Sequence, residues 1–229
     1  MKSYKVIAIL AIILLMISVS MNVINHRNNQ KKENYETAVD VALSNYLSHY
    51  NTGSIDRSLT RVITDRKVYF GEVGRPVNFL ARDFQELSNM HRELTLMYGP
   101  LFSFKNYNQI SSISTDPNIF DMLANFSSFF DYLYENNSDS IAIEDEQLYI
   151  SFNKLTDEER NGIEIIAEIT GELEKVRSES SQNKALMDYL EDYMLKSAEY
   201  FHTPEVQEKV AAFESIRIKL IPNMESDIG

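Results

Sequence analysis

An uninterrupted apolar run near the N-terminus constrains this chain more than any other feature of its sequence. The run holds no polar residue from Val6 to Ile17 and continues, through two serines and an asparagine, to Ile24. As an α-helix rising about 1.5 Å per residue, Val6–Ile24 reaches roughly the thickness of the hydrocarbon core of a bilayer. Helices buried in soluble proteins are usually amphipathic, whereas this run is apolar on all sides. The sequence therefore predicts one N-terminal transmembrane helix within residues 1–25.

A cleaved signal peptide is the alternative interpretation of the same residues. Lys2 and Lys5 form a basic start, Val6–Ile17 has the length of a signal-peptide core, and a small-residue triplet ends at Ser20. Residues 21–24 extend the apolar run beyond that triplet, which favours a retained signal-anchor. The alternative outcome is cleavage after Ser20 and release of a secreted helical protein.

Basic residues flank the run on both sides, so the positive-inside bias that orients membrane helices nearly cancels. A short N-terminal tail before a signal-like run usually stays in the cytoplasm. We therefore expect a single-pass protein of the cell membrane. Residues 26–34 would form a polar juxtamembrane linker, and residues 35–229 an acidic extracytoplasmic helical domain.

The charge of the chain is strongly asymmetric. Five bases and no acid fall in residues 1–32, so the remainder holds 17 of the 22 bases and all 34 acids. Such an excess of negative charge repels nucleic-acid backbones, and no nucleic-acid partner is expected. The chain has no Cys, which excludes disulfides, thiolate metal sites and a thiol nucleophile.

Hydrophobic spacing predicts a mainly α, antiparallel bundle-like domain. Apolar residues recur at intervals of three and four, and few Gly and Pro interrupt them. Thr156 and Glu159 have the spacing of a capping box. The expected helices cover residues 35–50, 58–70, 76–98, 117–136, 156–178 and 182–201, and a last segment after Pro204.

One segment, residues 140–152, departs from helical spacing. Ile141 and Ile143, and then Leu148 and Ile150, alternate with polar residues on either side of an acidic stretch at 144–146. This period of two predicts a small β-hairpin inserted between the helices.

His91 is the first candidate site residue. It lies within the apolar stripe formed by Leu80, Phe84, Leu87 and Leu94, so we expect it to be buried. A buried imidazole needs a hydrogen-bond partner, and a structural role is favoured over contact with a ligand or partner.

Three aromatic residues mark the second candidate site. Phe102, Phe104 and Tyr107 lie among Asn and Ser in a predicted loop, residues 101–115. Aromatic side chains exposed in a loop are good anchors for a protein partner. The alternative is that they fold back over the helical core as a lid.

No catalytic motif, metal site or cofactor site is identified in the sequence. Glu199 and His202 have the spacing of a helical metal-ligand pair, but both fall opposite the apolar stripe of their helix and no second pair exists. The sequence therefore favours a non-enzymatic interaction or ligand-binding module of the cell envelope, with a protein partner. The alternative is an envelope enzyme whose site is scattered along the chain.

We predict that the mature protein keeps its N-terminus and stays with the membrane after a high-salt or carbonate wash, because residues 21–24 continue the apolar run. N-terminal mass spectrometry of the membrane and soluble fractions measures this. A soluble form that begins at Met21 would contradict the anchor.

Overall fold

The computed structural model describes residues 26–27, 37, 52–74, 78–98, 105–114, 119–180 and 186–222. The chain divides into two units, Met1–Ser48 and His49–Gly229, and every helix and strand named below belongs to the second. Within the described ranges no helix combines the length and the apolar character needed to cross a bilayer. The predicted anchor at Val6–Ile24 lies outside them, as do almost all of the predicted linker and the helix expected over residues 35–50.

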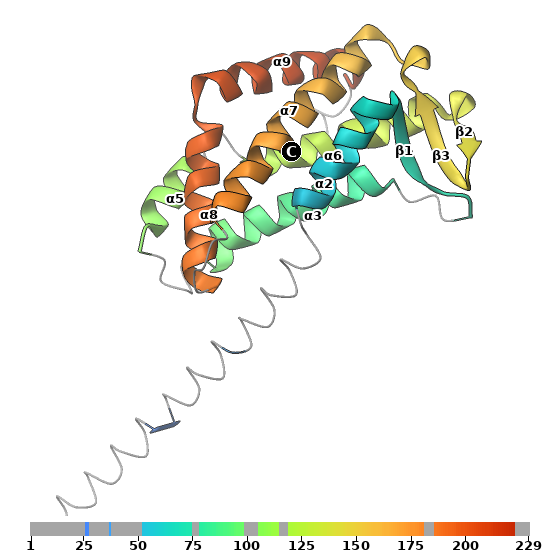
Figure 1. Ribbon diagram of the computed structural model, residues 1–229. Helices are drawn as coiled ribbons and strands as arrows, with labels where there is room; N and C mark the ends of the chain where they lie inside the picture. Colours follow the sequence, from blue (N-terminus) through green and yellow to red (C-terminus); the bar gives the residue numbers. More distant parts are fainter. Residues whose placement is uncertain are drawn as a thin grey trace, which may run out of the picture. The chain divides into compact units, whose positions relative to one another are not determined.

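The second unit is mainly helical and carries a small antiparallel sheet (Figure 1). Its described part contains seven α-helices, a π-helical turn, two short 3-10 turns and three strands. The α-helices are α2 (Thr52–Asp65), α3 (Phe79–Glu93), α5 (Tyr107–Ser114), α6 (Ile119–Asn136), α7 (Asp157–Ser180), α8 (Leu186–Phe201) and α9 (Pro204–Leu220). The remaining elements are η1 (Leu94–Tyr98, π-helical), η2 (Ser138–Ser140), η3 (Phe152–Lys154), β1 (Lys67–Glu72), β2 (Ala142–Glu144) and β3 (Gln147–Ser151).

Helices α3 and α6 form a closely packed antiparallel pair. The buried Ser127 of α6 donates its hydroxyl to the carbonyl of Ala81 in α3 at 2.7 Å. The buried Ser88 of α3 donates in turn to the carbonyl of Phe120 in α6, also at 2.7 Å. The partner of a residue further along α3 lies earlier in α6, which defines an antiparallel register. Because serine is small and its hydroxyl is satisfied in each case, the two backbones approach closely without an unpaired buried group.

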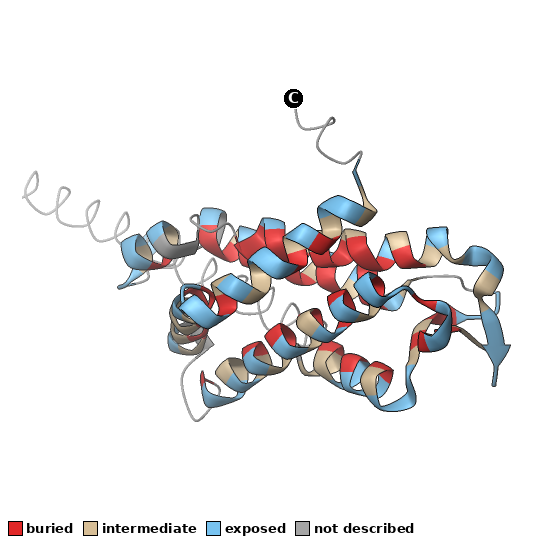
Figure 2. Cartoon of the chain, turned by 90° about the horizontal axis from the view of Figure 1, so that it is seen from above, coloured by how far each residue is buried: buried red, intermediate tan, exposed pale blue. Residues whose placement is uncertain are grey.

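Five phenylalanines fill the space between α3, α6 and α9. Phe84 stacks on Phe130 at 5.8 Å between ring centroids and meets Phe126 edge-on at 5.5 Å. Phe213 of α9 meets Phe126 and Phe129 edge-on at 4.9 and 5.5 Å. All five are fully buried, and Figure 2 shows buried residues concentrated along the inner faces of the helices. Aromatic pairs in these geometries add stabilisation beyond the area that they bury.

The predicted hairpin is confirmed. Strands β2 and β3 pair with Ala142 opposite Tyr149 and Glu144 opposite Gln147. Asp145 and Glu146 form the turn with φ of 48° and 64°, the left-handed conformation that two-residue hairpin turns require. All three acids of the turn region are exposed, as expected for a solvated turn.

The helix predicted over residues 58–70 is wrong at both ends. Helix α2 begins at Thr52 and ends at Asp65, and the chain reverses at Arg66, which has φ of 55°. Lys67–Glu72 is then a strand, β1, paired with β3 in a sheet of order β1-β3-β2. The buried Val68 and Phe70 alternate with the less buried Lys67 and Tyr69, which is the period of two expected for a strand. This period is hard to recognise in the sequence because it directly follows the helical spacing of α2.

Other helix boundaries lie closer to those predicted from the sequence. The helix predicted over residues 76–98 has its first residue at Phe79, capped by Asn78, and its last turn is π-helical. The capping box is confirmed, because the Thr156 amide donates to Glu159 Oε2 at 2.7 Å and the Glu159 amide to Thr156 Oγ1 at 3.2 Å. Helix α9 begins at Pro204 as predicted.

We predict that Gly162→Ala lowers the free energy of unfolding by about 2 kcal/mol, because overpacking outweighs the helix preference of alanine. A Cβ at Gly162 of α7 would lie 2.6 Å from Phe129 Cζ. Gly171→Ala in the same helix is the matched control, since its Cβ would meet only Asp56 Oδ1 at 3.4 Å. Urea denaturation of both variants measures the difference, and equal stability would contradict the packing of the Phe129 ring against Gly162.

Candidate functional site

His91 lies in the core and is hydrogen-bonded to a tyrosine from another helix. It is 1% exposed, as the sequence predicted, and its Nε2 lies 3.0 Å from the hydroxyl oxygen of Tyr193 in α8. Tyr193 is equally buried, and the two ring centroids are 5.5 Å apart. The bond joins α3 to α8 and gives the imidazole the partner that burial requires.

Burial keeps both members of this pair uncharged. It lowers the pKa of the His91 imidazole from 6.5 to about 4 and raises the pKa of the Tyr193 phenol well above its ordinary value. At neutral pH the pair is therefore a neutral imidazole and a protonated phenol. Such a pair holds two helices in register without burying a charge.

Two further hydroxyls, close in sequence to His91 and Tyr193, are also buried. Thr95 lies four residues after His91, and Ser197 four residues after Tyr193; both are fully buried. Within the described residues neither hydroxyl has a hydrogen-bond partner. Ser197 nevertheless lies close enough to Tyr193 to oppose the rise in the phenol's pKa. All four side chains are closed to solvent and lie within the core.

Of the three aromatic residues of the second candidate site, Tyr107 alone lies among the described residues. Tyr107 is the first residue of α5 and is half-buried, so the loop predicted over residues 101–115 is partly helical. The adjacent Asn106 amide donates to Glu191 Oε1 at 2.7 Å, which ties the start of α5 to α8. Phe102 and Phe104 lie outside the described residues. Contact of these aromatics, or of His91, with a ligand or partner stays a prediction.

Glu199 and His202 are both exposed, as their place on the helix predicted. Over the part of the chain that the structure describes, no group of three or more His, Asp or Glu side chains is arranged to hold a metal ion.

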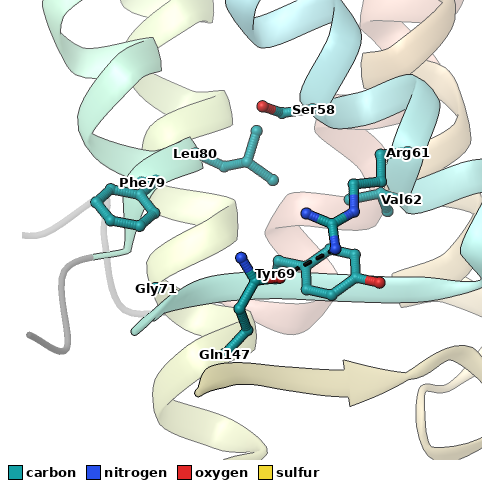
Figure 3. Close-up of a pocket in the computed structure, with 8 residues that line it drawn as sticks. All are labelled: Ser58, Arg61, Val62, Tyr69, Gly71, Phe79, Leu80 and Gln147. Atoms are coloured by element: carbon teal, nitrogen blue, oxygen red, sulfur yellow. Dashed lines mark hydrogen bonds between the residues drawn. The ribbon is translucent and has the colours of Figure 1, made fainter. Parts of the chain in front are cut away.

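A cleft that the sequence did not reveal lies where α2, α3 and the sheet meet (Figure 3). Its volume is about 110 Å³. Four elements contribute the residues around it. They are Ser58, Arg61 and Val62 of α2, Tyr69 and Gly71 of β1, Phe79 and Leu80 of α3, and Gln147 of β3. We call this the sheet-end cleft.

Arg61 is held in place at the edge of the sheet-end cleft by three contacts. Its guanidinium lies 3.9 Å from the centroid of the Tyr69 ring. Its Nε donates to Asp65 Oδ2 at 3.3 Å, and its Nη2 donates to Gln147 Oε1 at 3.0 Å. Tyr69 donates its own hydroxyl to Asp65 at 2.7 Å. The hydrogen bond from Tyr69 lowers the pKa of Asp65 most, and the bond from Arg61 lowers it further, so this carboxylate stays ionised.

Arg61 and Gln147 present hydrogen-bond donors to the sheet-end cleft, beside the hydroxyl of Ser58, which can donate or accept. Because the amide oxygen of Gln147 accepts from Arg61, its NH₂ group turns the other way, toward Phe79 and Leu80 (Figure 3). The second terminal nitrogen of Arg61 points into the same space. Val62 and Leu80 are buried and provide an apolar wall.

Comparison with protein-family models, with curated proteins and with solved structures finds no match to this chain. Its function is therefore inferred from its own residues.

We predict that the stability of the protein falls as the pH drops from about 6.5 to about 4, by up to about 3 kcal/mol from His91 alone. The unfolded state takes up a proton on this imidazole near pH 6.5, whereas the folded state does so only near pH 4. Protons therefore favour unfolding in that window, and this contribution is fully present above it.

His91→Gln should remove that part of the pH dependence and cost about 1–3 kcal/mol at pH 7, because the amide cannot reproduce the bond to Tyr193. His202→Gln is the control, since His202 is exposed. Denaturation of the three proteins at pH 7 and pH 4.5 measures both effects. If wild type and His91→Gln lost the same stability between pH 7 and pH 4.5, the lowered pKa of His91 would be contradicted.

Proposed function

We propose that this protein is a single-pass, membrane-anchored binding module. Its antiparallel bundle-like domain lies outside the cytoplasm and binds a protein partner at the sheet-end cleft, without catalysing a reaction. The observation that carries the proposal is the cleft itself: an apolar wall, an exposed aromatic rim and a guanidinium already fixed by three contacts.

The dimensions of the sheet-end cleft favour part of a large partner over a complete small-molecule ligand. Pockets for drug-sized molecules usually measure about 300–1,000 Å³, whereas this cleft measures about 110 Å³. A space of that size accepts one side chain or chain end. The remaining contact area must then come from the surrounding surface.

That surrounding surface carries exposed apolar side chains. Phe79 at the rim is 37% exposed, and Val73, directly after β1, is 51% exposed. The Val73 amide donates to the carbonyl of Glu146 in the hairpin turn at 2.8 Å, so its backbone is fixed. Apolar anchors on fixed backbone lose little conformational entropy on binding, which favours recognition of a protein surface.

The setting of His91 supports a non-enzymatic function. A general base must reach its substrate within hydrogen-bond distance. His91 is 1% exposed, and its Nε2 already bonds Tyr193. A role in joining α3 to α8 accounts for its burial and its partner.

We predict that a photocrosslinking amino acid at position 73 captures a specific partner in intact membranes of the native host, whereas the same amino acid at position 218 does not. Val73 and Ile218 are both β-branched and are 51% and 49% exposed, so they differ in place and not in accessibility. Immunoblotting of irradiated membranes measures the adducts. Equal capture at both positions, or none at 73, would refute binding at the sheet-end cleft.

A further inference from the structure

We infer that the sheet-end cleft binds the C-terminal carboxylate of a partner polypeptide whose last side chain is apolar, which deepens the proposed function and rests on it. Each feature of such a chain end has a counterpart in the cleft: two acceptor oxygens, one apolar side chain and a peptide chain that leaves toward solvent.

The first step is the hydrogen-bonding character of the cleft. Arg61 and Gln147 both present N–H groups to it, because the Gln147 amide oxygen is already occupied by Arg61 Nη2. A ligand that meets two donors, one of them charged, must supply acceptors. A carboxylate supplies two oxygens and forms the stronger, charge-assisted hydrogen bonds with a guanidinium.

The second step is the closeness of the apolar wall. Val62 and Leu80 are almost fully buried and line the same 110 Å³ as the two donors. The ligand therefore carries an apolar group a few bonds from its carboxylate. Asp and Glu side chains lack such a group, whereas the last residue of a polypeptide combines both when its side chain is aliphatic.

The third step is preorganisation. Arg61 is stacked on Tyr69 and bonded to Asp65 and Gln147 before any ligand arrives. The ligand then does not have to order a long flexible side chain, and the loss of conformational entropy on binding is smaller. Asp65 shares the Nε edge of the guanidinium and leaves a terminal nitrogen directed at the cleft (Figure 3).

The chain end leaves the cleft past exposed apolar surface. Phe79 forms one side of the opening, and the guanidinium of Arg82 lies 5.1 Å from its ring centroid. Residues that precede the last one in the partner can contact this rim. A free small acid would contact the two donors and the apolar wall but not the exposed rim. The exposed rim therefore favours a polypeptide as the molecule that carries the carboxylate.

The test uses the purified full-length protein in lipid nanodiscs, immobilised on beads. The probe is a pool of synthetic hexapeptides with five random positions and a C-terminal leucine, prepared once as the free acid and once, isotopically labelled, as the amide. Mass spectrometry of the retained peptides gives the acid-to-amide ratio. We expect the ratio to exceed about ten for the wild type, because a lost charge-assisted hydrogen bond weakens binding at least about tenfold.

Three variants assign the preference to the cleft. Arg61→Gln removes the charged donor, and Gln147→Glu replaces the second donor by a carboxylate that repels the ligand but still accepts from Arg61. Both should bring the ratio to about one. Arg57→Gln should keep the wild-type ratio, because Arg57 is an exposed base one turn earlier in α2 whose Nε bonds the carbonyl of Gly53. Gln147→Glu keeps the assignment testable if Arg61→Gln fails to fold.

The outcomes separate this inference from the proposed function. A wild-type ratio near one, or a loss of the preference in Arg57→Gln, overturns the carboxylate site even if position 73 still crosslinks to a partner. If free 4-methylpentanoate displaces the acid peptides at the same concentration, the ligand is not a polypeptide C-terminus, and the cleft is assigned to small carboxylic acids. Failure of crosslinking at position 73 overturns the proposed function itself.

Discussion

The pairing of α3 with α6 is the constraint on which the rest of this fold depends. Asn78, Ser88 and Ser127 each donate a side-chain hydrogen bond to a backbone carbonyl of the opposite helix, at 2.7 to 2.8 Å. These bonds share one antiparallel register, so they fix the two helices along their whole contact. With α3 and α6 fixed, their phenylalanines can pack against Phe213 of α9 in a single arrangement. Asn78 also caps α3, and in this way it sets the position of Phe79 and Leu80 at the sheet-end cleft.

Features that depend on local sequence were predictable, and features that depend on distant pairing were not. The hairpin and the Thr156–Glu159 cap follow from residues within a few positions of one another. Strand β1 is different, because its partner β3 lies some eighty residues further along the chain. Val68 and Phe70 are compatible with either a helix or a strand until that partner is known. Helix α5 escaped prediction because it is short and has few apolar residues to set a period.

The same distinction applies to the two candidate sites. The burial of His91 could be predicted because it lies within an apolar stripe of its own helix. Its partner, Tyr193, could not, since it lies 102 residues away on α8. The sheet-end cleft combines residues of α2, β1, α3 and β3, none of which forms a motif by itself. The direction of its donors depends further on one tertiary bond, between Arg61 and Gln147, which no pattern in the sequence encodes.

The two sites also show how this protein distributes charge between core and surface. Burying a charge is costly, and the core accordingly holds His91 and Tyr193 in their neutral forms. The side chain of Arg61 stays about half exposed, at 51%, and it is held by an aromatic ring, an amide and a carboxylate. A guanidinium in this setting keeps its charge and loses little entropy when a ligand binds. An anionic ligand therefore gains more from the cleft than from the buried pair, and it can reach the cleft without any opening of the core.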